Sequence, residues 1–327
     1  MGLIQTHLIY IFKTTIMKKL LFIIILSLPF FMLGQTTEDV QYYESGEVKS
    51  KVKLLDGVQQ GEGIDYYESG AVKSKGNFVD GKIQGEGIEY YESGAVKSKG
   101  NFVDGQRQGE GIDYYESGAV MTKANYVDGK IQGERIDYYE SYYESGAVKE
   151  KSKYIDDKFQ GEVIGYFENG AVKFKENYVN GKLQGEGIVY YESGVVKSKG
   201  NYVDGKKQGE WIEYYESGAV KSKGNYADDK IQGERIDYYE SYYESGAVQY
   251  KGNYVDGKTQ GEWIGYFENG AVKGKANYVN GKIQGEGIEY YESGAVQYKG
   301  NYVDGIQQGE AISYTVKGGI EKIENYK

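Results

Sequence analysis

Cysteine is absent from this sequence of 327 residues, and proline and histidine occur once each. Without cysteine the chain has no disulfide framework, no thiol nucleophile and no thiolate metal site. Leucine is scarce beyond residue 34, where only Leu54, Leu55 and Leu183 occur. Helical cores usually draw on strong helix formers such as leucine, so this scarcity argues against a helical bundle.

Glycine and tyrosine are abundant instead, with 49 and 37 copies. Glycine combined with aromatic and β-branched residues favours short strands joined by tight turns. The length alone would suit two ordinary domains. The composition does not, and it predicts an all-β fold.

The amino-terminal segment has the layout of a secretory signal peptide. Met17 is followed by two lysines, and residues 20–32 form a largely apolar run that ends two residues before Gly34. A membrane anchor is the alternative, but the run is shorter than the ~20 apolar residues of a spanning helix. We predict a signal peptide at residues 17–34, cleaved near Gly34, and export to the periplasm, outer surface or medium. Residues 1–16 then form an upstream extension, since Met17 alone would make a standard start.

Removal of this segment leaves 36 basic and 49 acidic side chains, a net charge of −13. Such a charge disfavours nucleic acid and anionic membrane surfaces as partners. Contact with a membrane is compatible with the sequence but is not indicated by the charge. His7 and Pro29 also leave with the segment.

The rest of the chain is one motif repeated. The pentapeptide YYESG and its close variants recur every 24 residues, with two steps of 28. A fixed period of this size is typical of a solenoid or array. We therefore predict a short linker at 35–41, a repeat array at 42–313 and a divergent carboxyl-terminal cap at 314–327. The eleven units begin at Tyr42, Tyr66, Tyr90, Tyr114, Tyr142, Tyr166, Tyr190, Tyr214, Tyr242, Tyr266 and Tyr290.

Each unit reads as one β-hairpin. In the unit that begins at Tyr66, residues 71–79 are expected to form a strand, 80–84 a turn and 85–91 the return strand, because Asp-Gly is a strong hairpin signal. Successive hairpins then add edge to edge into an elongated, twisted antiparallel meander with aromatic ladders. The structural turn residues of this scheme include Asp80, Gly81, Gly94, Gly205 and Gly218.

Two four-residue insertions lie 100 residues apart within a block of about four units that was copied whole. They are placed at residues 138–141 and 238–241. An even number of residues preserves the alternation of faces along a strand. We expect protruding hairpin ends or loops whose tyrosines are candidate binding residues, the alternative being a slack loop left by duplication. The tyrosines concerned are Tyr138, Tyr139, Tyr238 and Tyr239.

These residues resemble the bacterial variant of the MORN repeat. The resemblance rests on GNFVDGK at 76–82, QGE at 84–86 and YYESG at 90–94, and it extends from Tyr42 to about Ser313. It implies an elongated sheet of hairpins and a role in protein or membrane-surface contacts. Many bacterial members of this family carry the label of a YwqK-type toxin–antitoxin antitoxin component, which does not suit an exported chain.

One position varies while its surroundings stay constant. It follows each Gly-Glu and holds a tryptophan in the best-fitting copies, Trp211 and Trp263. These tryptophans could anchor a partner, and Arg135 and Arg235 could engage acidic groups, because both residue types are enriched at interface hot spots. The alternative is drift at a tolerant position. The other occupants are Gly63, Gly87, Gly111, Val163, Gly187, Gly287 and Ala311.

No unrepeated constellation of catalytic groups is present. The carboxylates of Glu86, Glu89 and Glu92 recur in most units near Lys73 and Lys75, which indicates charge pairing on a solvated face. The Asp-Gly turns lack the alternating oxygen ligands of a calcium-binding loop. We expect no catalytic site, metal or cofactor.

Three functions remain open. The first is an exported, non-catalytic scaffold that binds a protein or cell-surface component of unknown identity. The second is a carbohydrate- or cell-wall-binding module, because aromatic hairpin repeats of that type look similar. The third is an antitoxin-like inhibitor, which requires a cytoplasmic location.

Overall fold

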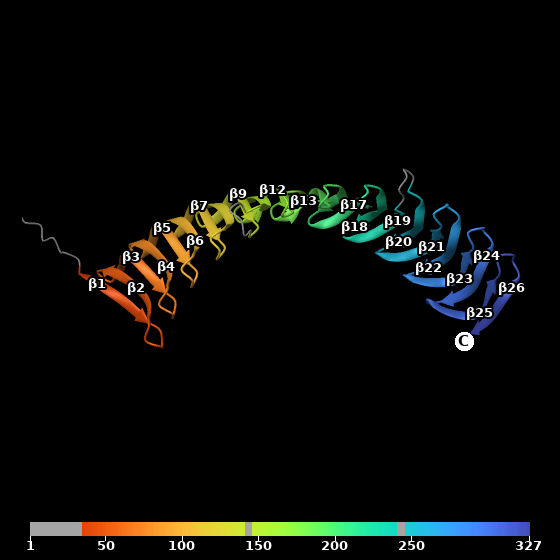
Figure 1. The fold of residues 1–327 in the computed structure, drawn as a ribbon, viewed down its shortest axis with the longest axis horizontal. Coiled ribbons are helices and arrows are strands. Elements are labelled where there is room, and N and C mark those ends of the chain that lie inside the picture. The colour runs from red at the N-terminus through yellow and green to blue at the C-terminus, as the bar shows by residue number, and fades with distance from the viewer. Residues whose placement is uncertain (1–34, 141–145, 241–245) are drawn as a thin grey trace, which may run out of the picture.

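A computed structural model describes residues 35–140, 146–240 and 246–327, so the predicted signal peptide and upstream extension lie outside the described residues. The described chain forms a single antiparallel sheet of 26 strands and contains no helix. The sheet is a long, curved and twisted band with its first and last strands at opposite ends (Figure 1). The predicted all-β meander of hairpins is therefore confirmed.

Consecutive strands pair along the whole band. Two of the return strands are each interrupted by one residue, which divides them into β11 and β12 and into β14 and β15. The strands are β1 (Thr36–Tyr42), β2 (Val48–Leu55), β3 (Val58–Tyr66), β4 (Val72–Val79), β5 (Lys82–Tyr90), β6 (Val96–Val103), β7 (Gln106–Tyr114), β8 (Val120–Val127), β9 (Lys130–Tyr138), β10 (Val148–Ile155), β11 (Lys158–Phe159), β12 (Gly161–Tyr166), β13 (Val172–Val179), β14 (Lys182–Leu183), β15 (Gly185–Tyr190), β16 (Val196–Val203), β17 (Lys206–Tyr214), β18 (Val220–Ala227), β19 (Lys230–Tyr238), β20 (Val248–Val255), β21 (Lys258–Tyr266), β22 (Val272–Val279), β23 (Lys282–Tyr290), β24 (Val296–Val303), β25 (Ile306–Tyr314) and β26 (Ile320–Tyr326).

The Asp-Gly turn is shorter than the sequence suggested. Asp80 and Gly81 have φ values of 50° and 77°, as a two-residue type I′ turn requires, and β5 begins at the next residue. Residues 82–84 belong to the return strand, not to the turn. Gly85, at φ 78°, instead forms part of a bulge that shifts the register between β4 and β5. Gly205 lies in the equivalent turn of a later hairpin.

The YYESG segment closes the other end of each hairpin with a bulged loop. Gly94 has a φ of 88°, and its N–H donates to the Tyr91 carbonyl at 2.9 Å. The Tyr91 N–H donates in turn to the Ala95 carbonyl at 2.8 Å. Gly218 occupies the same place at φ 89°.

Both ends of the array extend the sheet further than expected. Residues 36–42 form β1 and not a linker, because Tyr42 pairs with Val48 in the same way that Tyr66 pairs with Val72. The divergent tail also keeps the hairpin geometry. Its Gly318 turn leads into the edge strand β26, where Lys322 and Glu324 form an ion pair of 2.6 Å.

The insertions lie later in the chain than the sequence suggested. Tyr138 ends β9 as Tyr90 ends β5, and the Tyr139 N–H donates to the Ala147 carbonyl at 2.9 Å as Tyr91 does to Ala95. Tyr138 and Tyr139 are thus regular members of the array. The hydrogen bonding of the loop shows which of the two consecutive YYES copies belongs to the regular hairpin, and the sequence alone does not. The additional residues fall after position 139, partly at 141–145 and, in the second copy, partly at 241–245, which lie outside the described residues.

The two faces of the sheet differ in character because side chains alternate along each strand. On one face, which we call the lysine face, isoleucine and lysine alternate from strand to strand, as in Ile64, Lys75, Ile88 and Lys99. Glutamates of that face pair with these lysines, as Glu86 does with Lys99 at 3.5 Å.

The other face, which we call the groove face, carries three parallel rows of side chains. A central row runs through the middle of the strands and holds most of the buried residues, so the core of this single-layer protein is a line. An aromatic row lies toward the Asp-Gly turns, and a polar row lies toward the YYESG loops. The buried members of the central row include Val52, Gly63, Gly87, Ala124, Ser152, Val163, Trp211 and Ala311.

Candidate functional site

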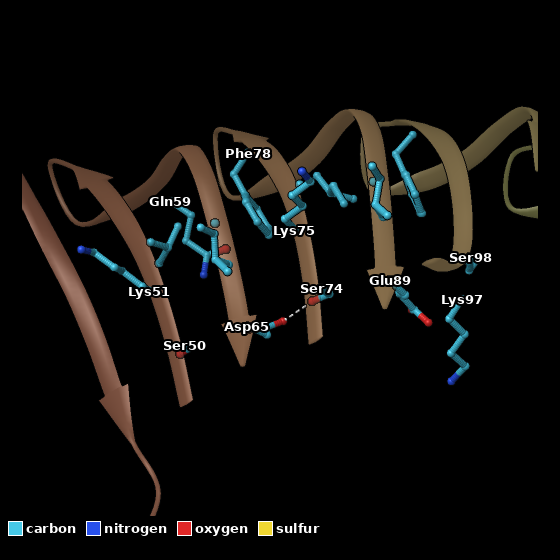
Figure 2. Close-up of a pocket in the computed structure, with 18 of the residues that line it drawn as sticks. Ser50, Lys51, Gln59, Asp65, Ser74, Lys75, Phe78, Glu89, Lys97 and Ser98 are labelled. Atoms are coloured by element: carbon cyan, nitrogen blue, oxygen red, sulfur yellow. Dashed lines mark hydrogen bonds between the residues drawn. The ribbon is translucent and has the colours of Figure 1, made fainter. Parts of the chain in front are cut away.

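A groove crosses strands β1 to β8 on the groove face, with a volume of about 770 Å³. Its floor is the central row at Gly63, Gly76 and Gly87, and the central row holds no side chain larger than a methyl group from β3 to β8. Figure 2 shows Phe78 of the aromatic row on one side of the groove and Asp65, Ser74 and Glu89 of the polar row on the other. The small residues are Gly63, Gly76, Gly87, Gly100, Gly111 and Ala124.

The glycines of the floor are covered by side chains of the aromatic row. A Cβ atom at Gly63 would lie 2.7 Å from the Phe78 ring, and one at Gly87 would lie 2.8 Å from the Phe102 ring. At Gly76, the Ile83 side chain would be 2.7 Å away. Each ring therefore reaches across the backbone of the preceding strand, and only glycine leaves room for it.

The polar row alternates hydroxyl and carboxylate groups. Ser74 Oγ donates to Asp65 Oδ2 at 2.7 Å, and Ser98 Oγ donates to Asp113 Oδ1 at 2.7 Å. Glu89 stands between these two serines in the register and is exposed. The row thus presents one carboxylate on every second strand along the groove.

Four basic side chains border the groove, and three of them have partners of their own. Lys51 pairs with Glu38 at 3.2 Å, and Lys75 lies over the Tyr90 ring at 5.7 Å, which places both on the lysine face. Arg107 donates to Ser98 Oγ at 2.7 Å and stacks over the Tyr126 ring at 4.8 Å. Lys97 extends past the polar row (Figure 2).

Tryptophan fills the central row farther along the array. Trp211 is only 7% exposed and packs between Tyr202 and Tyr226, at ring distances of 5.3 and 6.4 Å. Its ring covers Gly200 of the neighbouring strand, and Lys207 Nζ lies 4.1 Å from its centre. Burial raises the pKa of Tyr202. This tryptophan is a core residue and not an exposed anchor.

Trp263 repeats the arrangement between Tyr254 and Tyr278, at 5.5 and 6.1 Å, and is somewhat more exposed. The aromatic contacts differ from the continuous ladder that we expected. In the part of the chain that the structure describes, rings touch at these tryptophans and where Phe159 separates Tyr154 from Tyr178. Elsewhere aliphatic or polar side chains alternate with the rings.

The two arginines of the variable position are neutralised within their own strands. Arg135 Nη2 lies 2.9 Å from Asp137 Oδ1, and Arg235 repeats this contact with Asp237 at 2.9 Å. Hydrogen bonding to Asp137 raises the pKa of Arg135. These arginines close the central row without offering a free charge to a partner.

Hydrogen bonds between successive hairpins run along both borders of the sheet, and sequence reasoning missed both sets. On one border, Gln60 Oε1 accepts from the Asp80 N–H at 3.0 Å, a contact that ten hairpins repeat. The glutamine that precedes every Gly-Glu was the available signal. Its contact with the next turn explains why this glutamine recurs in every unit.

On the other border, the Tyr67 hydroxyl donates to the Tyr90 carbonyl at 2.8 Å. Tyr139 and Tyr239 make the same contact, to Tyr166 and Tyr266. Tyr138 and Tyr238 supply carbonyls that accept from Tyr115 and Tyr215 in the same ladder. All four tyrosines singled out at the insertions therefore belong to the regular ladder.

Phe167 and Phe267 stand where this ladder needs a tyrosine and have no hydroxyl to donate. In these hairpins an asparagine makes the contact to the next unit, since Asn169 Nδ2 donates to Glu192 Oε1 at 3.0 Å and Asn269 Nδ2 donates to Glu292 Oε1 at 2.9 Å. The YFENG variant thus lacks the tyrosine hydrogen bond and keeps a contact that Ser117 also makes in its own hairpin, to Glu140 at 3.0 Å.

Within residues 35–140, 146–240 and 246–327, no three His, Cys, Asp or Glu side chains are grouped as ligands for a metal ion. The same residues include no helix long and apolar enough to cross a membrane.

The model of the MORN repeat variant matches eight segments that together cover more than half of the chain. They are residues 59–80, 107–128, 159–180, 183–204, 207–228, 238–256, 259–280 and 283–304. The chain belongs to the MORN repeat variant family. The model of the MORN repeat itself matches residues 75–96. MORN repeats are generally non-catalytic scaffolds for binding. The toxin–antitoxin label has no counterpart in these matches.

No curated protein matches this MORN array. Among solved structures, the chain is 11% identical to a crystal structure of TcdB2-TccC3-TEV, and the match covers 89% of this chain and 17% of that chain with a TM-score of 0.16. For the Photorhabdus luminescens Tc holotoxin pore, the identity is 11%, the match covers 88% of this chain and 18% of that chain, and the TM-score is 0.17. A porin-like protein from Bacteroides uniformis is 9% identical over 66% of this chain and 94% of its own chain, with a TM-score of 0.15. The chain spans less than a fifth of the first two chains, and TM-scores this low do not indicate a shared fold.

Proposed function

We propose that this MORN array is a non-catalytic scaffold that holds an extended segment of a partner protein in the groove across β1 to β8. The observation that carries the proposal is the groove itself, on whose floor three successive strands, β3, β4 and β5, place only glycine. A groove with apolar walls and a few placed polar groups is the usual form of a binding site. The rest of the array supports this stretch as a rigid, repetitive frame.

A transplant within the array tests the proposal. Ile83→Thr combined with Gly87→Trp gives β5 the residues that β21 carries at Thr259 and Trp263, so the groove is filled by a side chain that this fold already accepts. Ile283→Thr with Gly287→Trp in β23 is the matched control, because β23 has the same sequence as β5 and lies outside the groove.

Both variants and the parent array are compared as baits against envelope and medium fractions, with bound segments located by cross-linking and mass spectrometry. We expect cross-links to β1–β8 that disappear in the β5 variant and persist in the β23 variant. Partners retained equally by all three proteins would refute the groove as the binding site. Circular dichroism of each variant checks that the sheet is intact.

Export is part of the same proposal and rests on the signal layout of residues 17–34. An exported array would meet its partner in the envelope or the medium. Fractionation with mass spectrometry of the mature amino terminus tests it, and we expect the chain to begin near Gln35. A cytoplasmic protein that retains residues 17–34 would refute export and would revive the antitoxin-like alternative.

The carbohydrate-binding alternative loses its main support. Modules of that type stack sugars on exposed tryptophans, whereas Trp211 is packed into the central row. A glycan array probed with the exported chain is the direct test. If the chain bound a glycan and the β5 transplant abolished that binding, the occupant of the groove would be a sugar chain and not a protein segment.

A further inference from the structure

Resting on the proposed function, we infer that the groove takes a cationic segment in the polyproline II conformation, with a lysine or arginine at every third residue. Three features support this occupant: the spacing of the carboxylates, the charge of Asp65 and Glu89, and the shape of the opposite wall.

The spacing of the carboxylates matches one turn of that helix. Asp65, Glu89 and Asp113 lie on β3, β5 and β7, so one strand separates each from the next. Strands are about 4.8 Å apart, which gives a repeat of about 9.6 Å along the groove. Polyproline II has three residues per turn and rises about 3.1 Å per residue, a repeat of about 9.3 Å with side chains i and i+3 on one side. A β-strand would direct i and i+3 to opposite sides.

The charge of the row calls for a cation. Asp65 accepts one hydroxyl hydrogen bond, from Ser74, and Glu89 is exposed between two serines. Within the described residues, neither carboxylate lies within ion-pair distance of a lysine or arginine. Asp113 lies 3.5 Å from Arg107, so it is the weakest of the three positions.

The opposite wall suits the residues between the cations. Phe78, Ile83 and Phe102 line the groove along its aromatic side. Proline-rich segments dock on grooves lined by aromatic side chains because their preformed conformation loses little entropy on binding. A segment that directs one side chain per turn at the polar row leaves the other two free to contact this wall.

The array itself sets the length of the segment. The next carboxylate of the row, Asp137, is bound by Arg135, whose side chain also closes the central row. Asp65, Glu89 and the Arg107-paired Asp113 span two repeats, or about 19 Å, which corresponds to roughly seven residues in polyproline II.

Synthetic peptides test the inference by fluorescence anisotropy at low and high salt. The test peptide is a labelled (Pro-Pro-Lys)₃ with neutral ends. A peptide of the same composition with its three lysines adjacent controls for spacing, and (Pro-Pro-Glu)₃ controls for charge. The proteins are the parent array, Glu89→Gln, and the matched control Glu213→Gln, which alters the same row beside Trp211 where the floor is filled.

We expect (Pro-Pro-Lys)₃ to bind more tightly than both control peptides and to weaken with salt. Glu89→Gln should reduce its affinity about five-fold, as the loss of about 1 kcal/mol for one solvated ion pair implies. Glu213→Gln should leave it unchanged. The β5 transplant should abolish binding.

Each other outcome has a distinct meaning. Equal binding of the two lysine peptides, or equal effects of Glu89→Gln and Glu213→Gln, would overturn the inference of a spaced cationic segment. If (Pro-Pro-Glu)₃ or a neutral polyproline peptide bound as well and the β5 transplant abolished that binding, the inference would fail while the proposed groove function stood. No binding by any peptide would overturn the inference, and the cross-linking experiment would then judge the groove by itself.

Discussion

The stretches β3–β8 and β16–β22 are built from the same repeated motif but differ in the central row of the groove face. In the first stretch, glycine and alanine leave a groove, and the aromatic row folds down over the floor. In the second, Trp211, Arg235 and Trp263 fill the row, and the neighbouring tyrosines pack against the tryptophan rings. A single position per hairpin therefore decides between an open groove and a closed core, while the Asp-Gly turns and the pairing of the strands stay the same.

The largest expected effect comes from emptying the filled stretch. Trp211→Gly removes a ring that is packed between two tyrosines, and it should lower the free energy of unfolding by about 3–5 kcal/mol. Trp263→Gly should cost less because Trp263 is more exposed. Urea denaturation followed by tyrosine and tryptophan fluorescence measures both losses. Equal losses would show that burial does not determine what the tryptophans contribute.

The reverse change, adding bulk to the open stretch, should have an intermediate effect. Gly87→Ala places a Cβ atom 2.8 Å from the Phe102 ring, and we expect a loss of about 1–3 kcal/mol. Gly224→Ala in the filled stretch is the control, since its nearest neighbour is the flexible end of Ile231 at 3.1 Å. Thermal melts of the two variants give the difference. A larger loss at Gly224 would contradict the role assigned to the covering ring.

The tyrosine ladder offers a smaller test that runs in both directions. Phe167→Tyr should add the missing hydrogen bond to the Tyr190 carbonyl and stabilise the array by about 0.5–1.5 kcal/mol. Tyr191→Phe in the next hairpin removes such a bond, of 2.9 Å to the Tyr214 carbonyl, and should destabilise by a similar amount. Chemical denaturation of the pair measures both signs. If both substitutions changed the free energy of unfolding in the same direction, or each in the direction opposite to that expected, the ladder would not be what binds the hairpins together.

The smallest effect is expected at the boundary between the two stretches, where Glu150 follows Asp137 in the polar row. Burial, and then the charge of Asp137, raise the pKa of Glu150 above its usual 4.5. The folded state thus holds this proton more tightly than the unfolded state, and stability falls as the pH rises from 4.5 through the higher folded value.

Glu150→Gln removes this dependence. The variant should melt at a higher temperature than the parent at neutral pH and show no such gain below pH 4.5. Glu86→Gln, which alters an exposed partner of Lys99 on the lysine face, is the control. If Glu150→Gln raised the melting temperature equally at every pH, the cause would be packing and not ionisation.

Much of the architecture could be predicted from the repeat. The period, the Asp-Gly signal and the glycine of YYESG indicated a meander of hairpins, and the sheet has that form. The exact turn length could not be predicted. The position of the insertions could not be predicted either, because the motif YYES occurs twice at each insertion. The hydrogen bond from Tyr139 to Ala147 decides between them, and the sequence does not encode that pairing locally.

The candidate site was harder to predict because its meaning depends on neighbours from other hairpins. Trp211 and Arg135 stood out as variable and suggested binding residues, yet one is buried and the other is paired with Asp137. The glycines at the same position attracted no functional interpretation. Two of them, Gly63 and Gly87, form the floor of the groove, since a ring from the following strand covers each one and no side chain rises from it.

The sequence by itself determined the class, the period and the chemistry of this protein: an all-β array of hairpins, acidic, without cysteine and with one variable position per unit. Only the tertiary structure decided which side of the sheet that position faces and whether it opens or fills the central row. The reason is physical. Local turn preferences fix each hairpin, but a single-layer sheet has no interior until its strands are paired. Exposure is therefore set by side chains that reach across from the next strand.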